Sequence, residues 1–232
     1  MRVRKLKKQV LGLLRSDDFK NGVESICRLP ARQAVNPLFS FFYNADELIR
    51  WRAITAMGAV VSRLADQDME SARVVMRRLI WNLNDESGGI GWGSPEAMGE
   101  IMARHKGLSE EYAHILVSYA DENGNFIEHE ILQRGVLWGL GRLAHSRPEL
   151  VTHAGPFLIP YLQSEDPIHR GLAAWAAGAF QTDLTQPLLE RLAGDKNRIT
   201  IFIEMRLVVR QVGQLAREAI LRQKKEPPFT AE

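Results

Sequence analysis

Apolar residues in the first fifteen positions recur every three or four residues, and lysines and arginines fill the opposite face. The apolar set is Val3, Leu6, Val10, Leu13 and Leu14. This spacing predicts an amphipathic helix over residues 3–15. Asp17 or Asp18 then suits the N-cap of a second helix that ends near Leu29-Pro30. The basic face of the first helix is interpreted as solvated, with attachment to a membrane or nucleic acid as the alternative.

From Asn36 onward the pattern repeats a short apolar helix, a turn that contains Asp, and a second helix. In the first repeat these parts are residues 37–43, the turn 44–46, and residues 48–64. The order returns four times, with turn aspartates Asp85, Asp121, Asp166 and Asp195 after the Asp46 of the first repeat. Separations of roughly 30–45 residues are typical of paired-helix solenoids.

Two of these repeats share a sequence motif. Residues 166–178, D-P-I-H-R-G-L-A-A-W-A-A-G, and residues 46–58 place Asp, Arg and Gly at equal spacing. The motif resembles HEAT repeats, specifically the short HEAT-like repeats named from phycobilisome lyases, and the resemblance covers about residues 36–215. It implies that turn aspartates and second-helix arginines pair as a ladder between neighbouring repeats, through Asp46, Arg50, Asp166 and Arg170. The block Trp81–Glu100 also resembles an uncharacterised bacterial family.

The chain is therefore predicted to be a single all-α domain over residues 1–232. Its predicted architecture is a right-handed α-α superhelix (a HEAT/armadillo-like solenoid) of about five to six helix pairs, because each pair exposes an apolar face that only its neighbours can bury. Residues 1–35 are expected to be capping helices, 36–215 the repeats, and 216–232 the end of the last helix and a mobile tail. That last helix is expected to run from Ile199 to Lys224, and the pattern is interpreted as leaving little room for a sheet.

Composition narrows the function only slightly. Thirty Lys and Arg against 28 Asp and Glu give a net charge of +2, so nucleic-acid binding is permitted but not indicated. Cys27 is the single cysteine, which excludes a disulfide within the chain and a cysteine-based zinc cluster. The apolar run Val10–Leu14 is too short to span a membrane. A soluble cytoplasmic protein with no membrane partner is expected.

Two stripes of residues at four-residue spacing mark a candidate binding surface on the second helices. One stripe contains Glu96 and Glu100, and the other contains Glu130, Arg134, Trp138 and Arg142. Because second helices line the concave surface of a solenoid, we expect the two stripes to face each other there. The glycine-rich loop at residues 84–93 forms the rim beside them, and the turn at residues 121–125 is expected to complete it. The candidate binding residues are Asn84, Asp85, Glu86, Trp92, Glu96, Glu100, Glu130, Arg134, Trp138 and Arg142.

Structural interpretations compete with this binding surface. Glu130 and Arg134 also fit the ladder, and Glu96 and Glu100 also suit a solvated helix start, where negative charge is favourable. The glycine-rich loop also suits a flexible connection whose Trp92 packs into the core, although its glycines raise the entropy lost on ordering.

Catalytic and metal chemistry receive little support. The triplet at residues 128–130, Glu-His-Glu, resembles one His-Glu step of the iron-binding HEAT-repeat hydroxylases, but the other histidines do not repeat it. No metal and no cofactor are expected. Ser87, Ser94 and Cys27 lack the sequence context of a catalytic nucleophile, so no catalytic residue is assigned.

The function predicted from these features is a non-catalytic scaffold that binds a protein segment on its concave surface, with Trp and Arg side chains as anchors. One alternative is a DNA-binding or DNA-repair protein similar to the alkylpurine DNA glycosylases, which use a HEAT-like solenoid. The acidic centre of the candidate surface opposes a phosphate backbone. A second alternative is a small-molecule or chromophore-lyase-like role, which rests on fold analogy alone.

Overall fold

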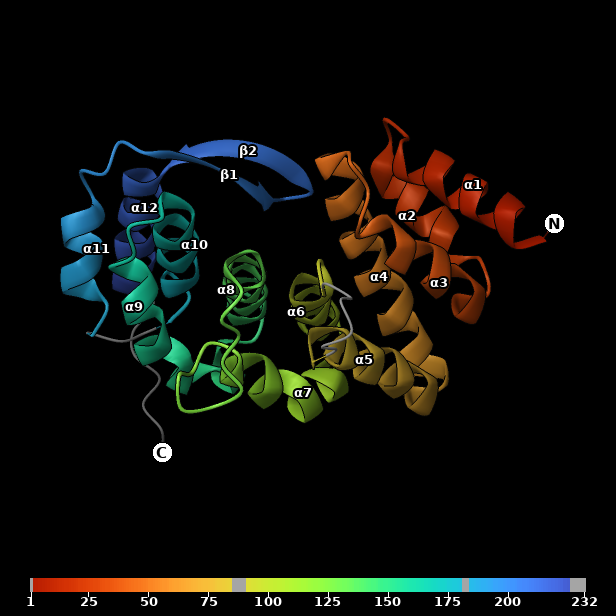
Figure 1. The fold of residues 1–232 in the computed structure, drawn as a ribbon, viewed down its shortest axis with the longest axis horizontal. Coiled ribbons are helices and arrows are strands. Elements are labelled where there is room, and N and C mark those ends of the chain that lie inside the picture. Colours follow the sequence, from red (N-terminus) through yellow and green to blue (C-terminus); the bar gives the residue numbers. More distant parts are fainter. Residues whose placement is uncertain (1, 85–90, 181–183, 226–232) are drawn as a thin grey trace. The chain divides into compact units, whose positions relative to one another are not determined.

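The computed structural model describes residues 2–84, 91–180 and 184–225. The chain divides into two compact units, Met1–Ser109 and Glu110–Glu232, and the boundary falls within helix α7 (Lys106–Ser118). Helices build most of both units (Figure 1). None of the described helices is both long and apolar enough to cross a membrane.

The first unit is organised around its longest helix, α4 (Glu47–Gln67), which packs against the other helices of the unit. These are α1 (Arg2–Leu14), α2 (Phe19–Cys27), α3 (Ala31–Phe41), α5 (Met69–Asn84) and α6 (Ser94–Arg104). Small residues on α4 let α6 approach closely: a Cβ added at Gly58 would lie 2.5 Å from Cγ of Glu100. Such close approach is how neighbouring repeats in a solenoid bury a continuous core.

The helix starts in this unit follow the caps that the sequence predicts. The Asp18 carboxylate accepts the backbone N–H of Asn21 at 3.1 Å, and the Asp46 carboxylate accepts that of Leu48 at 2.9 Å. The predicted start of the third helix at Pro37 is wrong, because α3 begins at Ala31 and contains Pro37. Pro37 has no N–H to donate to a carbonyl one turn earlier, but it is buried within the core and the helix continues through it.

The second unit stacks three helices in series, with α10 (Pro167–Ala177) between α8 (Glu130–Ala144) and α12 (Val212–Lys225). The short first helices beside them are α9 (Ile159–Leu162) and α11 (Gln186–Leu192). The repeat pattern places a short first helix before the Asp166 turn, and this segment is α-helical only from Ile159. The preceding turns, Pro148–Leu150 and Thr152–Leu158, are 3₁₀ helices.

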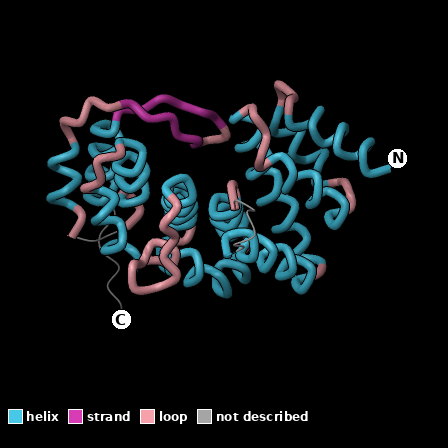
Figure 2. Tube along the Cα trace, in the orientation of Figure 1, coloured by secondary structure: helices cyan, strands magenta, loops and turns pink. Residues whose placement is uncertain are grey.

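A β-hairpin interrupts the last repeat, so the predicted helix over Ile199–Lys224 is wrong in its first half. Strand β1 (Arg198–Ile203) pairs antiparallel with β2 (Arg206–Gln211), shown in magenta in Figure 2. The run R-I-T-I-F-I alternates in burial over its first four residues and is rich in β-branched residues, which favours a strand over a helix. The two-residue turn places Glu204 and Met205 at φ of 50° and 62°.

The hairpin is inserted at the start of the final second helix. Its two ends meet there: the N–H of Val212 donates to the Asn197 carbonyl and that of Gly213 to the Asp195 carbonyl, both at 2.9 Å. Helix α12 therefore begins beside Asp195, where a repeat without the insertion would begin its second helix. The repeat pattern is conserved in space although the sequence between Asp195 and Val212 breaks it.

Candidate interaction surface

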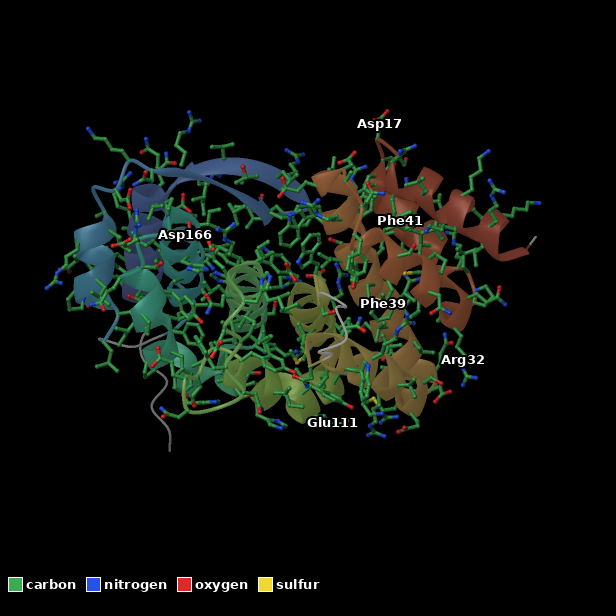
Figure 3. The ribbon with its side chains drawn as sticks, in the orientation of Figure 1. Asp17, Arg32, Phe39, Phe41, Glu111 and Asp166 are labelled. Atoms are coloured by element: carbon green, nitrogen blue, oxygen red, sulfur yellow. The ribbon has the colours of Figure 1, made fainter. Side chains whose placement is uncertain are left out.

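The predicted ladder of aspartates and arginines is present in the second unit. Arg134 donates from Nε to the Asp166 carboxylate at 3.2 Å (Asp166 is labelled in Figure 3). Arg170 donates from Nε and Nη2 to Asp195 at 2.9 and 2.8 Å. Each arginine therefore binds the turn aspartate of the next repeat, and each rung ties two repeats together.

The same aspartates also cap helices and fix the turns. Asp166 accepts the backbone N–H of Ile168 at 2.9 Å, at the start of α10. Burial opposes ionisation of Asp195, but the backbone N–H of Asn197 and the Arg170 guanidinium together hold the pKa of Asp195 below its ordinary value. Asp195 is thus ionised at neutral pH, and its rung is charge-assisted.

In the first unit, Asp46 and Arg50 are the equivalents of Asp166 and Arg170. They make the contacts within their own turn. Arg50 donates from Nη1 to the Asn44 carbonyl at 2.9 Å, as Arg170 does to the Ser164 carbonyl six residues before it. The turn aspartate of the following repeat is Asp85, which lies outside the described residues, as does Glu86. Of the predicted contacts of Asp46 and Arg50, the structure therefore describes those within their own turn.

Glu130 forms the outer end of the ladder. Its carboxylate pairs with Arg134, which contacts Asp166 on its other side. The Glu130 side chain is 60% exposed, whereas that of Asp166 is 19% exposed. Glu130 and Arg134 are brought together as their four-residue spacing predicts.

Trp138 and Arg142, the other two residues of the predicted stripe on α8, do not form an exposed binding surface, contrary to the prediction. Trp138 is only 4% exposed and donates from Nε1 to the Phe202 carbonyl at 2.8 Å. Its ring also stacks on Trp175 at 6.1 Å between centroids. The hairpin absent from the prediction supplies Phe202, so Trp138 is a core residue and not an exposed anchor. Arg142 is half-buried and bonds to Ser146, just after the end of α8.

On α6, Glu100 is buried and Glu96 is half-buried, which corrects the expectation of a solvated or ligand-facing pair. Glu100 is 4% exposed, and its carboxylate accepts from Nε and Nη2 of Arg104 at 2.7 and 2.6 Å. Its Cγ lies 2.5 Å from the position that a Cβ on Gly58 of α4 would occupy. Glu100 therefore joins two repeats and is not available to select a partner.

Glu96, in contrast, is half-buried as a residue. Its Oε2 atom is inaccessible to solvent and has no hydrogen-bond partner. Burial raises the pKa of Glu96 to about 7, and its own backbone N–H and the Arg50 charge only partly oppose this rise. The missing solvation outweighs the favourable position in the first turn of α6.

Trp92 and Asn84 are the described candidates of the glycine-rich loop. Trp92 is half-buried and stacks on Tyr43 with 6.3 Å between ring centroids. Asn84 is exposed at the end of α5. Gly93 adopts φ of 76° against the Phe42 ring, so one glycine of this loop has a defined structural role.

The sequence-based prediction did not include a concentration of acidic charge before α8. Between Lys106 and Arg134 the chain has six Asp and Glu residues and no Lys or Arg. Glu122, Glu128 and Glu130 are exposed and Asp121 is half-buried. We refer to Asp121, Glu122, Glu128 and Glu130 as the acidic rim. Charge counted along the chain would have found it, whereas a search for helical stripes did not.

Backbone hydrogen bonds fix the loop that carries the acidic rim. The N–H of Gly124 donates to the Asp121 carbonyl at 2.9 Å, and that of Ile127 donates to the Tyr119 carbonyl at 3.2 Å. Ile127 itself is buried. The carboxylates therefore project from an ordered loop. Within the described ranges, no group of three or more His, Cys, Asp or Glu side chains is placed to hold a metal ion.

Comparisons with solved structures define the class of protein. The chain is similar to a designed armadillo repeat protein in complex with the peptide (KR)4, with a TM-score of 0.53 over 93% of this chain and 98% of that one, at 18% identity. It is also similar to an engineered protein, with a TM-score of 0.54, 95% and 97% coverage and 15% identity. The protein thus has the fold of HEAT/armadillo-type repeat proteins, which confirms the predicted all-α superhelix.

Sequence comparison adds one relative. An uncharacterised protein of Archaeoglobus fulgidus is 33% identical over 119 residues, which is 51% of this chain and 56% of that protein. The chain thus spans little more than half of the relative's length. That relative is archaeal, and the resemblance of Trp81–Glu100 to a bacterial family stays a prediction. No family model matches the chain.

Proposed function

We propose that the protein is a non-catalytic HEAT-like scaffold that binds a segment of a protein partner on the surface of its second helices, which is the concave surface in this fold. The acidic rim beside α8 receives a basic part of that segment. Of the residues predicted from the sequence, Glu130 and Arg134 belong to this surface. The buried Trp138 stabilises the core of the second unit, and the buried Glu100 that of the first unit.

Glu130 carries the proposal. Its side chain is 60% exposed and yet held by Arg134, which Asp166 holds in turn. A carboxylate that is ordered before binding loses less conformational entropy when a ligand arrives. Asp166 and Asp195 are 19% and 11% exposed and each accepts from an arginine. Among these ladder carboxylates, Glu130 is therefore the best placed to accept a cation from a partner.

The charge of the rim and the fold of the chain both favour a basic peptide. Four carboxylates, in the ordered loop and at the first residue of α8, attract Lys and Arg and repel a phosphate backbone. The designed armadillo repeat protein with the same fold is in complex with (KR)4, so such a solenoid can hold an alternating basic peptide. Because that likeness is in fold alone, the preference of this chain rests on its own carboxylates.

A fluorescein-labelled (KR)4 peptide tests the proposal in an anisotropy titration. We expect the double variant Glu128→Gln/Glu130→Gln to weaken binding about fivefold or more, since each exposed ion pair contributes up to about 1 kcal/mol. The matched control is Glu149→Gln/Glu218→Gln, which removes the same charge at two other exposed positions of the second unit.

The control separates a site from general attraction to negative charge. A loss confined to the rim variant supports the proposal. Equal losses in the two double variants would show that the peptide senses only net charge. Undetectable binding to the wild type would also reject a basic segment as the partner of the rim.

A further inference from the structure

The outward face of α5 presents large side chains to solvent. Trp81 is 69% exposed and Val74 is 53% exposed. Arg78 lies four residues after Val74 and three before Trp81, so the three share one helical face. Single exposed apolar residues are ordinary on protein surfaces, but an exposed Trp beside Arg has the composition of a binding hot spot.

Arg78 is held in a fixed orientation on this face. Its guanidinium lies 4.0 Å from the centroid of the Phe39 ring, and Nη1 donates to Oδ1 of Asn36 at 2.6 Å (Phe39 is labelled in Figure 3). Stacking on an aromatic ring orients a guanidinium while leaving its outer N–H groups available. Arg78 is therefore organised to bind an anion before the anion arrives.

The neighbouring arginines differ from Arg78 because carboxylates neutralise them. Arg32 pairs with Asp68 at 3.0 Å, and Arg77 pairs with Glu70 at 2.6 Å. Over the described residues of the first unit, no carboxylate lies within ion-pair distance of Arg78. The positive charge on this face is thus concentrated at one stacked guanidinium between two exposed apolar side chains.

We propose that this α5 face docks a short acidic segment of a protein partner. A carboxylate of the segment binds Arg78, and an apolar side chain packs against Trp81 and Val74. A planar guanidinium recognises a carboxylate through paired hydrogen bonds, and contact with an indole adds buried apolar area. The complementary charge is a single anion flanked by apolar groups, which fits a peptide.

A nucleic acid fits this face less well. Binding a phosphate backbone requires several cations that neutralise successive phosphates. Here Asp68 and Glu70 already pair with Arg32 and Arg77. The α5 face is a different surface from the acidic rim and has the opposite charge preference. The two proposals therefore stand or fall separately.

The test measures binding of the full chain to a fluorescein-labelled peptide, (Glu-Glu-Leu)3, by anisotropy. We expect Trp81→Ala and Arg78→Gln each to weaken binding about tenfold, as hot-spot truncations do. Arg78→Lys keeps the charge but loses the planar stack, so we expect an intermediate loss. Because Trp81 and Arg78 are exposed, the thermal midpoints of the variants should stay close to that of the wild type.

Matched controls make the result specific to this face. Leu221→Ala removes an exposed apolar side chain on α12, and Arg191→Gln removes an exposed arginine on α11. Neither should change binding, and the uncharged peptide (Gln-Gln-Leu)3 should bind far more weakly than the acidic one. Wild-type protein that binds neither peptide at about 1 mM overturns the proposal.

Three further outcomes also overturn it. Equal binding of the two peptides would mean that Arg78 recognises no carboxylate. Tighter binding of a nine-nucleotide oligothymidine, lost in the same two variants, would assign the face to nucleic acid. Self-association of the wild type that Trp81→Ala abolishes would assign the face to a second copy of the chain.

Discussion

Arg170 donates from both Nε and Nη2 to one carboxylate oxygen of Asp195, at 2.9 and 2.8 Å, across the boundary between two repeats. Its Nη1 atom also donates to the Ser164 and Glu165 carbonyls at 2.9 and 2.8 Å. One side chain therefore closes the turn of its own repeat and binds the turn of the next. Asp195 also binds the chain at both ends of the hairpin: its carboxylate accepts the N–H of Asn197, and its backbone carbonyl accepts that of Gly213.

Removing this arginine should destabilise the protein. The side chains of Arg170 and Asp195 are only 15% and 11% exposed. We expect Arg170→Gln to lower the free energy of unfolding by about 2 kcal/mol, between the values typical of exposed and buried ion pairs. Urea denaturation measures the change, and the double variant with Asp195→Asn should lose less than the sum of the two single variants.

The exposed pair Arg32–Asp68 is the control for this prediction. Its N–O distance of 3.0 Å is similar, but its side chains are 75% and 44% exposed. Arg32→Gln should change the unfolding free energy little, since solvent screens exposed pairs. If both arginine variants lost the same stability, burial would not be the reason that the Arg170 rung matters.

The ladder was expected because the HEAT-like resemblance implies it, and the motif that carries this resemblance has local spacing. Asp, Arg and Gly recur at fixed offsets, which places the caps and turns, and the resemblance adds the rungs between them. The burial of Glu100, and of the Oε2 atom of Glu96, could not be predicted from spacing. It depends on how closely α6 approaches α4, and the absent Cβ of Gly58 determines that approach. A charged residue at helical spacing does not by itself reveal which face meets a neighbour.

Gly93 is expected to resist substitution. Its φ of 76° is unfavourable for a residue with a Cβ, and a Cβ there would lie 2.8 Å from Cγ of Phe42. We expect Gly93→Ala to destabilise the protein by about 2 kcal/mol. Urea denaturation checks this against Gly12→Ala, which adds a Cβ with no atom within 4 Å in helix α1.

The control should move in the opposite direction. Alanine at an open helical position stabilises by up to about 1 kcal/mol relative to glycine. A neutral or stabilising Gly93→Ala would mean that the loop before α6 accepts another backbone conformation. In that case the left-handed turn at Gly93 would not be required for α6 to begin at Ser94.

The hairpin turn is open to improvement. Glu204 and Met205 both have positive φ in a two-residue turn, the arrangement of a type I′ turn, which favours Asn-Gly. We expect Glu204→Asn/Met205→Gly to raise the free energy of unfolding by about 1 kcal/mol, because Asn and Gly adopt this conformation at lower cost. Denaturation with urea measures the change, and Glu218→Asn on α12 serves as a control for an exposed glutamate. A loss of stability in the double variant would contradict the turn assignment.

This turn also explains why the hairpin escaped prediction. The pair Glu-Met is not a turn signal, so the strands on either side merged with the following helix into one apolar, helix-length segment. The consequence reached the candidate site, because Trp138 is covered by Phe202 of β1. A contact between residues 64 positions apart cannot be read from the periodicity of either segment.

Glu96 should make stability depend on pH in an unusual direction. Burial raises its pKa from an ordinary 4.5 to about 7, against the opposing charge of Arg50. Between these values the folded state binds a proton that the unfolded state has released, so the contribution of Glu96 to the unfolding free energy is greatest below pH 4.5 and falls as pH rises through 7. Glu96→Gln, which mimics the protonated form, should therefore be more stable than wild type at pH 8 by about 3 kcal/mol and equally stable near pH 4.5.

Urea denaturation of both proteins from pH 4.5 to 8 gives this difference. The stability difference between the proteins isolates Glu96, because His145, whose pKa burial lowers to about 4, destabilises both equally on acidification. A difference that stays constant with pH would show that the Glu96 carboxylate is solvated or paired in the folded protein.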